Sequence, residues 1–278
     1  MMKKRFIRLS TGEVFYRHFG RPNGQAPVLL LHPSPLSSAF MERLGLFLSD
    51  SFEVYAPDLP GYGLSEPLAR PPQQMADYVP FLREFMKKKR LQRVRLYGTA
   101  TGCQLAIAFA LAFPQCVERL VGENACHFED DERAALFHTY FPDLSPRPDG
   151  SHLLRAWEMC YKTCIGFPWT AVPDGTSLPA GVSLAQVQAM VGDTLLAGEQ
   201  YAAAYRAAFE HERVEHVQAL QVPAVFILWQ HSVMRPYMER LAAFPMPPQV
   251  QWKRCNGDVN ERYRLVKNSF LSPQLAQT

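Results

Sequence analysis

Short, largely apolar runs alternate with helical segments through the first half of the chain, and this alternation constrains the fold more than any other feature. Four runs predict strands buried on both faces of a parallel sheet, at residues 28–32, 52–57, 94–97 and 119–124. Three segments between them have helical spacing, at residues 44–51, 78–90 and 101–113. This order predicts an α/β protein with a doubly wound, mostly parallel sheet. The ligand site of such a sheet lies beyond the carboxyl ends of its strands.

The two ends of the chain extend this sheet. A hairpin is predicted over residues 6–17 around the turn Thr-Gly-Glu at 11–13. Further elements are predicted late in the chain, as strands at 222–229 and 250–255 and a closing helix at 261–270. From 128 to 218 the strand signals give way to helices and proline-rich connections. The sequence therefore predicts a core domain made of residues 1–127 and 219–278, with residues 128–218 inserted as a helical cap.

Composition excludes several function classes. The formal net charge is +3 in 278 residues, and the basic residues are scattered, which argues against a nucleic-acid partner. We expect neither a signal peptide nor a membrane span, because no apolar run is long enough, and we therefore expect a cytoplasmic protein. The six cysteines lack the close pairing of a zinc site, so we expect reduced thiols, no metal and no cofactor. A small-molecule ligand is the expected partner, and the sequence does not specify an oligomeric state.

Three segments carry a family resemblance. Residues 29–38 read Leu-Leu-Leu-His-Pro-Ser-Pro-Leu-Ser-Ser, residues 58–65 read Asp-Leu-Pro-Gly-Tyr-Gly-Leu-Ser, and residues 98–102 read Gly-Thr-Ala-Thr-Gly. In this order and spacing they resemble the loop that supplies half of the oxyanion hole, a characteristic turn, and the nucleophile elbow of the α/β-hydrolases. The resemblance covers roughly residues 5–125 and 220–275, and it implies the fold of that family.

The same resemblance argues against the usual chemistry of the family. The elbow motif G-x-S-x-G needs a nucleophile at its apex, and this chain has Ala100 there. The loop after residue 229, where the triad acid usually lies, reads Gln-His-Ser-Val-Met and contains no carboxylate. The triad histidine usually follows a glycine after the last strand, but Gly257 is followed by Asp258. Ordinary ester hydrolysis through an acyl-enzyme is therefore not expected.

The groups that bind an oxyanion are retained. In this fold the two donors are the N–H of the residue after the apex, here Thr101, and an N–H of the early loop. Pro33 and Pro35 have no N–H, which leaves Ser34 as the donor in that loop. A pocket for a carbonyl, carboxylate or phenolate oxygen beside Ala100 is thus predicted without a nucleophile.

Four further residues have a functional and a structural interpretation. Glu123 follows the strand before the cap, where some family members carry their acid, and it either faces the site or caps the next loop. His127 either lines the pocket or is a loop histidine without a role. Asp-Gly-Ser-His at 149–152 opens a helix with Ser151 as its N-cap, and His152 and Trp157 on that helix are candidate ligand contacts.

The two vacant triad positions have exchanged residue types, with His231 near the acid position and Asp258 at the histidine position. If the two side chains meet, the carboxylate would orient the imidazole as a general base. In the alternative, Asp258 pairs with Arg262 on the closing helix. The sequence predicts binding of a small carbonyl-bearing or aromatic molecule between core and cap. The alternative function is a non-classical hydrolase or lyase that uses a His/carboxylate base without an acyl-enzyme.

Overall fold

A computed structural model describes residues 2–272. Its centre is an eight-stranded sheet in the order β1-β2-β4-β3-β5-β6-β7-β8. The strands are β1 (Lys3–Leu9), β2 (Gly12–Phe19), β3 (Val28–Leu31), β4 (Val54–Pro57), β5 (Val94–Thr99), β6 (Val117–Glu123), β7 (Ala224–Trp229) and β8 (Val250–Cys255). Strands β3 to β8 run parallel to one another, while β2 pairs antiparallel with both β1 and β4. The doubly wound, mostly parallel sheet predicted from the sequence is confirmed.

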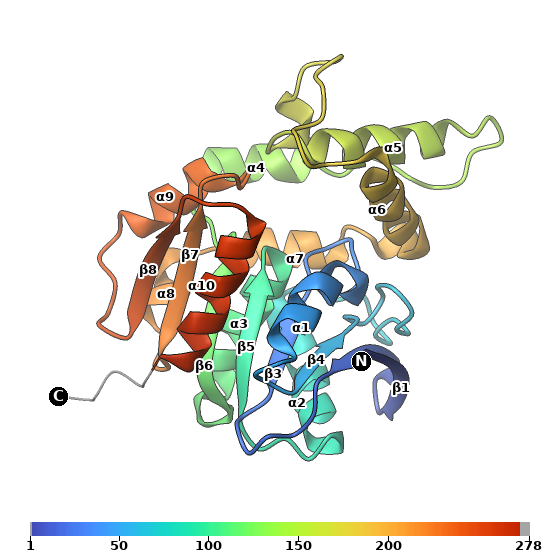
Figure 1. Cartoon of the computed structure of the whole chain (residues 1–278). Coiled ribbons are helices and arrows are strands. Elements are labelled where there is room, and N and C mark those ends of the chain that lie inside the picture. The colour runs from blue at the N-terminus through green and yellow to red at the C-terminus, as the bar shows by residue number, and fades with distance from the viewer. Residues whose placement is uncertain (1, 273–278) are drawn as a thin grey trace.

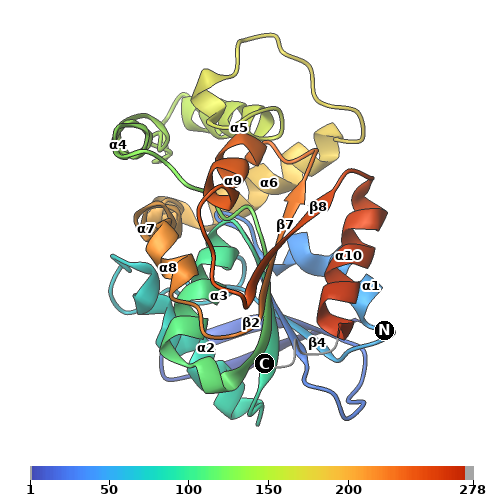
Figure 2. The same cartoon turned by 90° about the vertical axis from the view of Figure 1, so that its left-hand side faces the viewer.

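Helices cover both faces of the sheet, as Figures 1 and 2 show. Those of the core are α1 (Glu42–Leu48), α2 (Val79–Lys88), α3 (Thr101–Ala112), α8 (Val214–Gln218), α9 (Arg235–Ala242) and α10 (Val259–Leu271). Alternate residues of β3 point to opposite faces of the sheet. Leu29 and Leu31 pack in the cluster with α2 and α3, and Val28 and Leu30 pack in the cluster with α1 and α10. This alternation explains why the strand is apolar without interruption.

The connection between β6 and β7 is helical. It contains α4 (Asp130–Thr139), α5 (Ser151–Thr163), α6 (Leu184–Leu196), α7 (Ala203–His211) and α8. Helices α4, α5 and α6 lie above the carboxyl ends of the parallel strands (Figure 1). Helices α7 and α8 instead pack against α3 of the core. The predicted cap range of 128–218 therefore contains two parts: a lid formed by α4, α5 and α6, and two helices that lie on a face of the sheet.

Aromatic side chains pack against one another beneath the lid. Phe209 of α7 contacts the rings of Phe128, Tyr140 and Phe167 at centroid separations of 5.5–6.2 Å. The indole N–H of Trp169 donates to the carbonyl of Tyr140 at 3.0 Å. These contacts give the lid a packed apolar underside. No described helix is both long and apolar enough to cross a bilayer.

Candidate functional site

The turn between β5 and α3 has an unusual backbone. Ala100 has φ 48° and ψ −119°, a conformation that costs a residue with a side chain about 1–3 kcal/mol. A Cβ at Gly98 would lie 2.2 Å from the carbonyl oxygen of Gly102, and a Cβ at Gly102 would lie 2.0 Å from that of Leu31. Only glycine fits at these two positions. The turn therefore keeps the sharp strand-to-helix geometry that exposes an apical side chain, although that side chain is a methyl group.

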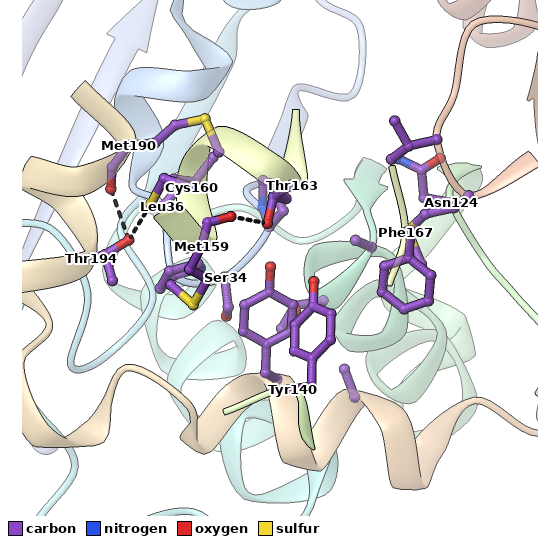
Figure 3. A pocket seen from close by; sticks show the side chains of 18 of the residues that line it. Ser34, Leu36, Asn124, Tyr140, Met159, Cys160, Thr163, Phe167, Met190 and Thr194 are labelled. Atoms are coloured by element: carbon purple, nitrogen blue, oxygen red, sulfur yellow. Dashed lines mark hydrogen bonds between the residues drawn. The ribbon is translucent and has the colours of Figure 1, made fainter. Parts of the chain in front are cut away.

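A cavity of about 200 Å³ lies beside Ala100, between core and lid. Figure 3 shows its walls, which are mostly apolar or aromatic. The core contributes Ser34, Leu36, Ala100, Thr101 and Asn124; the connection contributes Tyr140, Met159, Cys160, Thr163, Phe167, Met190, Thr194, Tyr205, Ala208, Phe209 and Glu212. Among the described residues that line it, none is a histidine, lysine or arginine. The cavity thus suits an apolar molecule with few polar groups.

Polar groups converge where the cavity meets the turn. Thr101 is the first residue of α3, so its N–H lies in the unpaired first turn of a helix, where the dipole favours negative charge. The hydroxyls of Thr101 and Ser34 are both buried without a hydrogen bond of good geometry. Ser34 lies beside the hydroxyl of Tyr62, which already donates to the carbonyl of Tyr201 at 3.1 Å. The structure thus brings Ser34, Ala100 and Thr101 together in the cavity lining, and their contact with a ligand stays a prediction.

The loop that carries Ser34 is fixed from both sides. His32 Nε2 accepts from the N–H of Leu59 at 2.9 Å, so Nδ1 carries the proton that reaches the Pro33 carbonyl at 3.0 Å. Burial lowers the pKa of His32, which keeps the ring neutral. On the lid side, Asp193 of α6 accepts hydrogen bonds from the N–H and the hydroxyl of Ser37 at 3.0 and 2.9 Å. The loop therefore connects the lid to the sheet.

Glu123 does not face the cavity. Its carboxylate lies 3.5 Å from a guanidinium nitrogen of Arg262, and that guanidinium stacks 4.2 Å from the ring centroid of Trp229. Burial raises the pKa of Glu123, and the charge of Arg262 opposes this rise. Because arginine stays protonated, the pair cannot act as an acid–base dyad. Neither sequence interpretation of Glu123 is correct: it is half of a buried ion pair on the α10 face of the sheet.

His231 and Asp258 are not brought together. The Asp258 carboxylate caps α10 by accepting from the N–H groups of Asn260 and Glu261 at 3.0 and 2.9 Å. The exposed His231 has its Nε2 3.0 Å from the amide nitrogen of Gln230. Between these two described residues there is neither a hydrogen bond nor an ion pair, so the exchanged dyad is not formed. The alternative pair of Asp258 with Arg262 is also not formed, since Arg262 pairs with Glu123.

Comparison with known proteins gives one consistent result. A family model described as "alpha/beta hydrolase fold" matches residues 26–147. Epoxide hydrolase A from Mycobacterium thermoresistibile superposes with a TM-score of 0.71 at 16% identity, covering 98% of this chain and 97% of that one. The chain has the α/β-hydrolase fold.

Curated relatives match only in part. An uncharacterised protein of Mycobacterium tuberculosis is 34% identical over 107 residues, which are 38% of this chain and 31% of that protein. The 2-hydroxy-6-oxononadienedioate/2-hydroxy-6-oxononatrienedioate hydrolase 2 of Pseudomonas putida is 31% identical over 125 residues, 42% of this chain and 43% of the relative. The matches thus span less than half the length of these relatives.

A neutral polar network lies at the carboxyl ends of the central strands. Asn124, at φ 54°, donates from its amide to Thr99 Oγ1 at 3.0 Å and accepts from Ser232 Oγ at 2.7 Å. Ser232 belongs to the loop after β7, which usually supplies the triad acid. These bonds join the ends of β5, β6 and β7 without any group that titrates near neutral pH. Neither Asn124 nor Ser232 could be selected in advance, because no motif in the sequence marks them.

The other expected ligand contacts lie away from the cavity. His127 packs against Phe244 with ring centroids 4.8 Å apart, and its Nε2 is 3.7 Å from a carboxylate oxygen of Glu129. His152 accepts from the N–H of Arg147 at 3.1 Å on the outer side of α5. Trp157 lines a separate surface depression. The structure therefore gives these three residues no contact with the cavity beside Ala100.

One residue of the cavity went unrecognised in the sequence. Glu212 directly follows α7, has 2% of its surface exposed, and lines the cavity. It lies in the run Phe-Glu-His-Glu-Arg at 209–213, whose charges resemble a solvated helix end. The described residues contain no group of three or more side chains able to hold a metal ion. Among the described residues that line the cavity, Glu212 is the only carboxylic acid.

Proposed function

We propose that this protein binds a small, neutral, carbonyl-bearing or aromatic molecule in the cavity beside Ala100, without a covalent step. The observation that carries the proposal is the cavity itself: an apolar chamber that ends on an intact elbow with a methyl group at the apex. Thr101 and Ser34, the expected oxyanion-type donors, line this cavity together with Ala100. Such a site can hold and orient a ligand oxygen, while the methyl group at the apex of the turn cannot attack it.

Size limits the ligand. An apolar cavity of roughly 150 Å³ admits benzene, so a cavity of about 200 Å³ accommodates an aromatic ring with a small substituent. The aromatic walls offer edge and face contacts to such a ring. A keto or aldehyde oxygen directed at the N-terminus of α3 would take the place of the oxyanion.

The relatives support a carbonyl group in the ligand but not its charge. The Pseudomonas putida relative is named for hydrolysis of an oxo-dioate. Here no lysine or arginine lines the described cavity, so nothing there would compensate ligand carboxylates. We therefore propose a ligand that keeps the carbonyl and lacks the charge.

The enzymatic alternative has weaker support. An enzyme of this kind needs a histidine paired with a carboxylate to act as a general base. His231 and Asp258 each have other partners. Glu123, the other candidate acid, is paired with Arg262. A general base for water would have to come from elsewhere in the cavity wall.

Binding can be tested with acetophenone as a neutral aromatic ketone, measured by isothermal titration calorimetry. Met159→Trp should fill the cavity from α5 and lower the affinity at least tenfold. The matched control is Leu154→Trp on the same helix, where the side chain is 75% exposed, and it should leave affinity unchanged. Saturable binding that Met159→Trp does not weaken would place the ligand elsewhere and refute the proposal.

A further inference from the structure

Glu212 occupies a specific place in the cavity wall. It follows the last residue of α7, next to Ala208 and Phe209, which also line the cavity. Its carboxyl lies beside the Gln104 side chain in the first turn of α3. The helix that begins with Thr101 therefore has Glu212 next to its first turn, so the acid lies at the same end of the cavity as the oxyanion-type donors.

The carboxyl of Glu212 has no ionic partner among the described residues. Its Oε2 atom is buried without a hydrogen bond. The nearest cation, Arg133, uses its donors on other groups: Nε reaches the Phe209 carbonyl at 3.1 Å and one amino group reaches Asp130 at 2.8 Å. Its remaining amino group donates to the carbonyls of Phe128 and of Glu212 itself, at 3.1 and 3.0 Å. Arg133 thus holds the backbone of Glu212 and makes no hydrogen bond to its carboxyl.

The other groups facing this carboxyl are uncharged. The thiols of Cys103 and Cys126 are buried, and burial raises the pKa of each. His211 Nδ1 lies 2.9 Å from Gln104 Oε1, and burial lowers the pKa of this histidine to about 3. The neutral ring therefore donates to Oε1 and leaves the amide NH₂ of Gln104 for its other neighbours.

Burial decides the ionisation of Glu212. Removal from water raises the pKa of the carboxyl well above its usual range, and the opposing effects of Arg133 and Gln104 are smaller. A carboxylic acid without a paired cation in an apolar site stays protonated, since ionisation there is costly. Protonated, it is a hydrogen-bond donor.

We propose that Glu212 is the specificity-determining anchor of the cavity: an un-ionised acid that donates a hydrogen bond to an oxygen of a neutral ligand and rejects carboxylates. This inference rests on the proposed binding function. The rejection of anions follows because a ligand carboxylate would be buried among mostly apolar side chains with no lysine, arginine or histidine in the described lining to compensate its charge. An amine would be the opposite case, since it would draw the proton from Glu212 and form an ion pair.

Three probes of similar shape separate these cases: acetophenone, benzoate and benzylamine, titrated at pH 7 into the intact protein. Acetophenone should bind, and benzoate should bind at least tenfold more weakly. Glu212→Gln retains a donor of the same shape, so acetophenone affinity should stay within about threefold. Glu212→Met removes the donor and should weaken acetophenone about tenfold, as expected for one neutral hydrogen bond. Tighter binding of benzylamine than acetophenone, lost in Glu212→Gln, would overturn the inference.

A measurement without ligand tests the protonation state independently. Below the pKa of Glu212 in the unfolded chain, both states carry the proton, so ionisation makes no contribution to stability. Above it the unfolded state releases its proton while the folded state keeps it, so wild-type stability falls with rising pH. The Tm of Glu212→Gln minus that of wild type should therefore increase from pH 4 to pH 8, and parallel Tm curves would overturn the inference.

The outcomes distinguish the two proposals. If Met159→Trp abolishes acetophenone binding but Glu212→Met leaves it unchanged, the inference on Glu212 falls and the binding function stands. If acetophenone does not bind the wild-type protein at all, both proposals lose their support.

Discussion

Replacing Arg262 by methionine should destabilise the protein through the carboxylate it leaves behind. Glu123 and Arg262 have only 4% and 16% of their side chains exposed, and their charged atoms are 3.5 Å apart. Breaking a buried pair at one partner costs about 3–5 kcal/mol, because the remaining charge keeps its desolvation penalty. At about 2 °C per kcal/mol for a chain of this size, the Tm should fall by about 6–10 °C.

The matched control replaces both partners. Glu123→Gln combined with Arg262→Met removes the charge that would be left uncompensated, and it should recover at least half of the lost free energy of unfolding in urea denaturation. A lower pH should also reduce the loss of free energy of unfolding in Arg262→Met, since the unpaired Glu123 takes up a proton as the pH falls. A loss below about 1 kcal/mol for Arg262→Met at pH 7, or no recovery in the double variant, would show that the pair carries no such energy.

Three shorter predictions concern the cavity and its loop. Fluorophosphonate probes should not label the protein stoichiometrically, and a labelled peptide containing Thr99 or Thr101 in mass spectrometry would contradict this. Ala100→Ser should show no appreciable turnover of p-nitrophenyl acetate, because no histidine reaches the apex to activate the hydroxyl; robust turnover would reveal an unseen base. Asp193→Ala removes two charge-assisted hydrogen bonds to Ser37 and should cost about 1.5–3 kcal/mol, with faster limited proteolysis of residues 128–218; unchanged proteolysis would show that the lid is held by other contacts.

The fold could be predicted because strand burial is visible in the sequence itself. A strand such as Val28–Leu31 is covered on both faces, so its residues are all apolar and the run marks its position. Helix ends were less certain: α1 begins at Glu42 and ends at Leu48, whereas the spacing indicated 44–51. Helix α9 was not predicted, because the loop before it was interpreted only through its missing acid.

The residues of the candidate site also differ in how far the sequence could predict their positions. Ser34, Ala100 and Thr101 lie in short motifs whose backbone geometry is local, so their place beside one cavity could be predicted from the sequence. The orientation of Glu123 could have been predicted from the alternation of side chains along β6. Glu123 lies two residues after Val121, which packs on the α1 and α10 face. Side chains two apart on a strand share a face, so Glu123 had to point away from the cavity.

Other residues depended on contacts that no local pattern encodes. Glu212 is buried because α7 packs against α3, more than a hundred residues away in the chain. His231 and Asp258 lie on neighbouring loops, yet the backbone N–H groups at the start of α10 take the carboxylate of Asp258. Asp258 therefore accepts from N–H groups two and three residues away in the chain and does not pair with His231 on the neighbouring loop.

The adjacency of β6 and β7 has a consequence for how the lid is attached. Parallel neighbours in a sheet need a crossover connection, usually a single helix on one face. Helix α8, packed on α3 immediately before β7, already supplies such a helix. The chain from α4 to α6 is therefore an insertion into a complete β–α–β unit and leaves the sheet register untouched. A lid attached in this way can change in length and lining while the turn at Ala100 and its donors stay in place, so ligand choice and scaffold can vary separately.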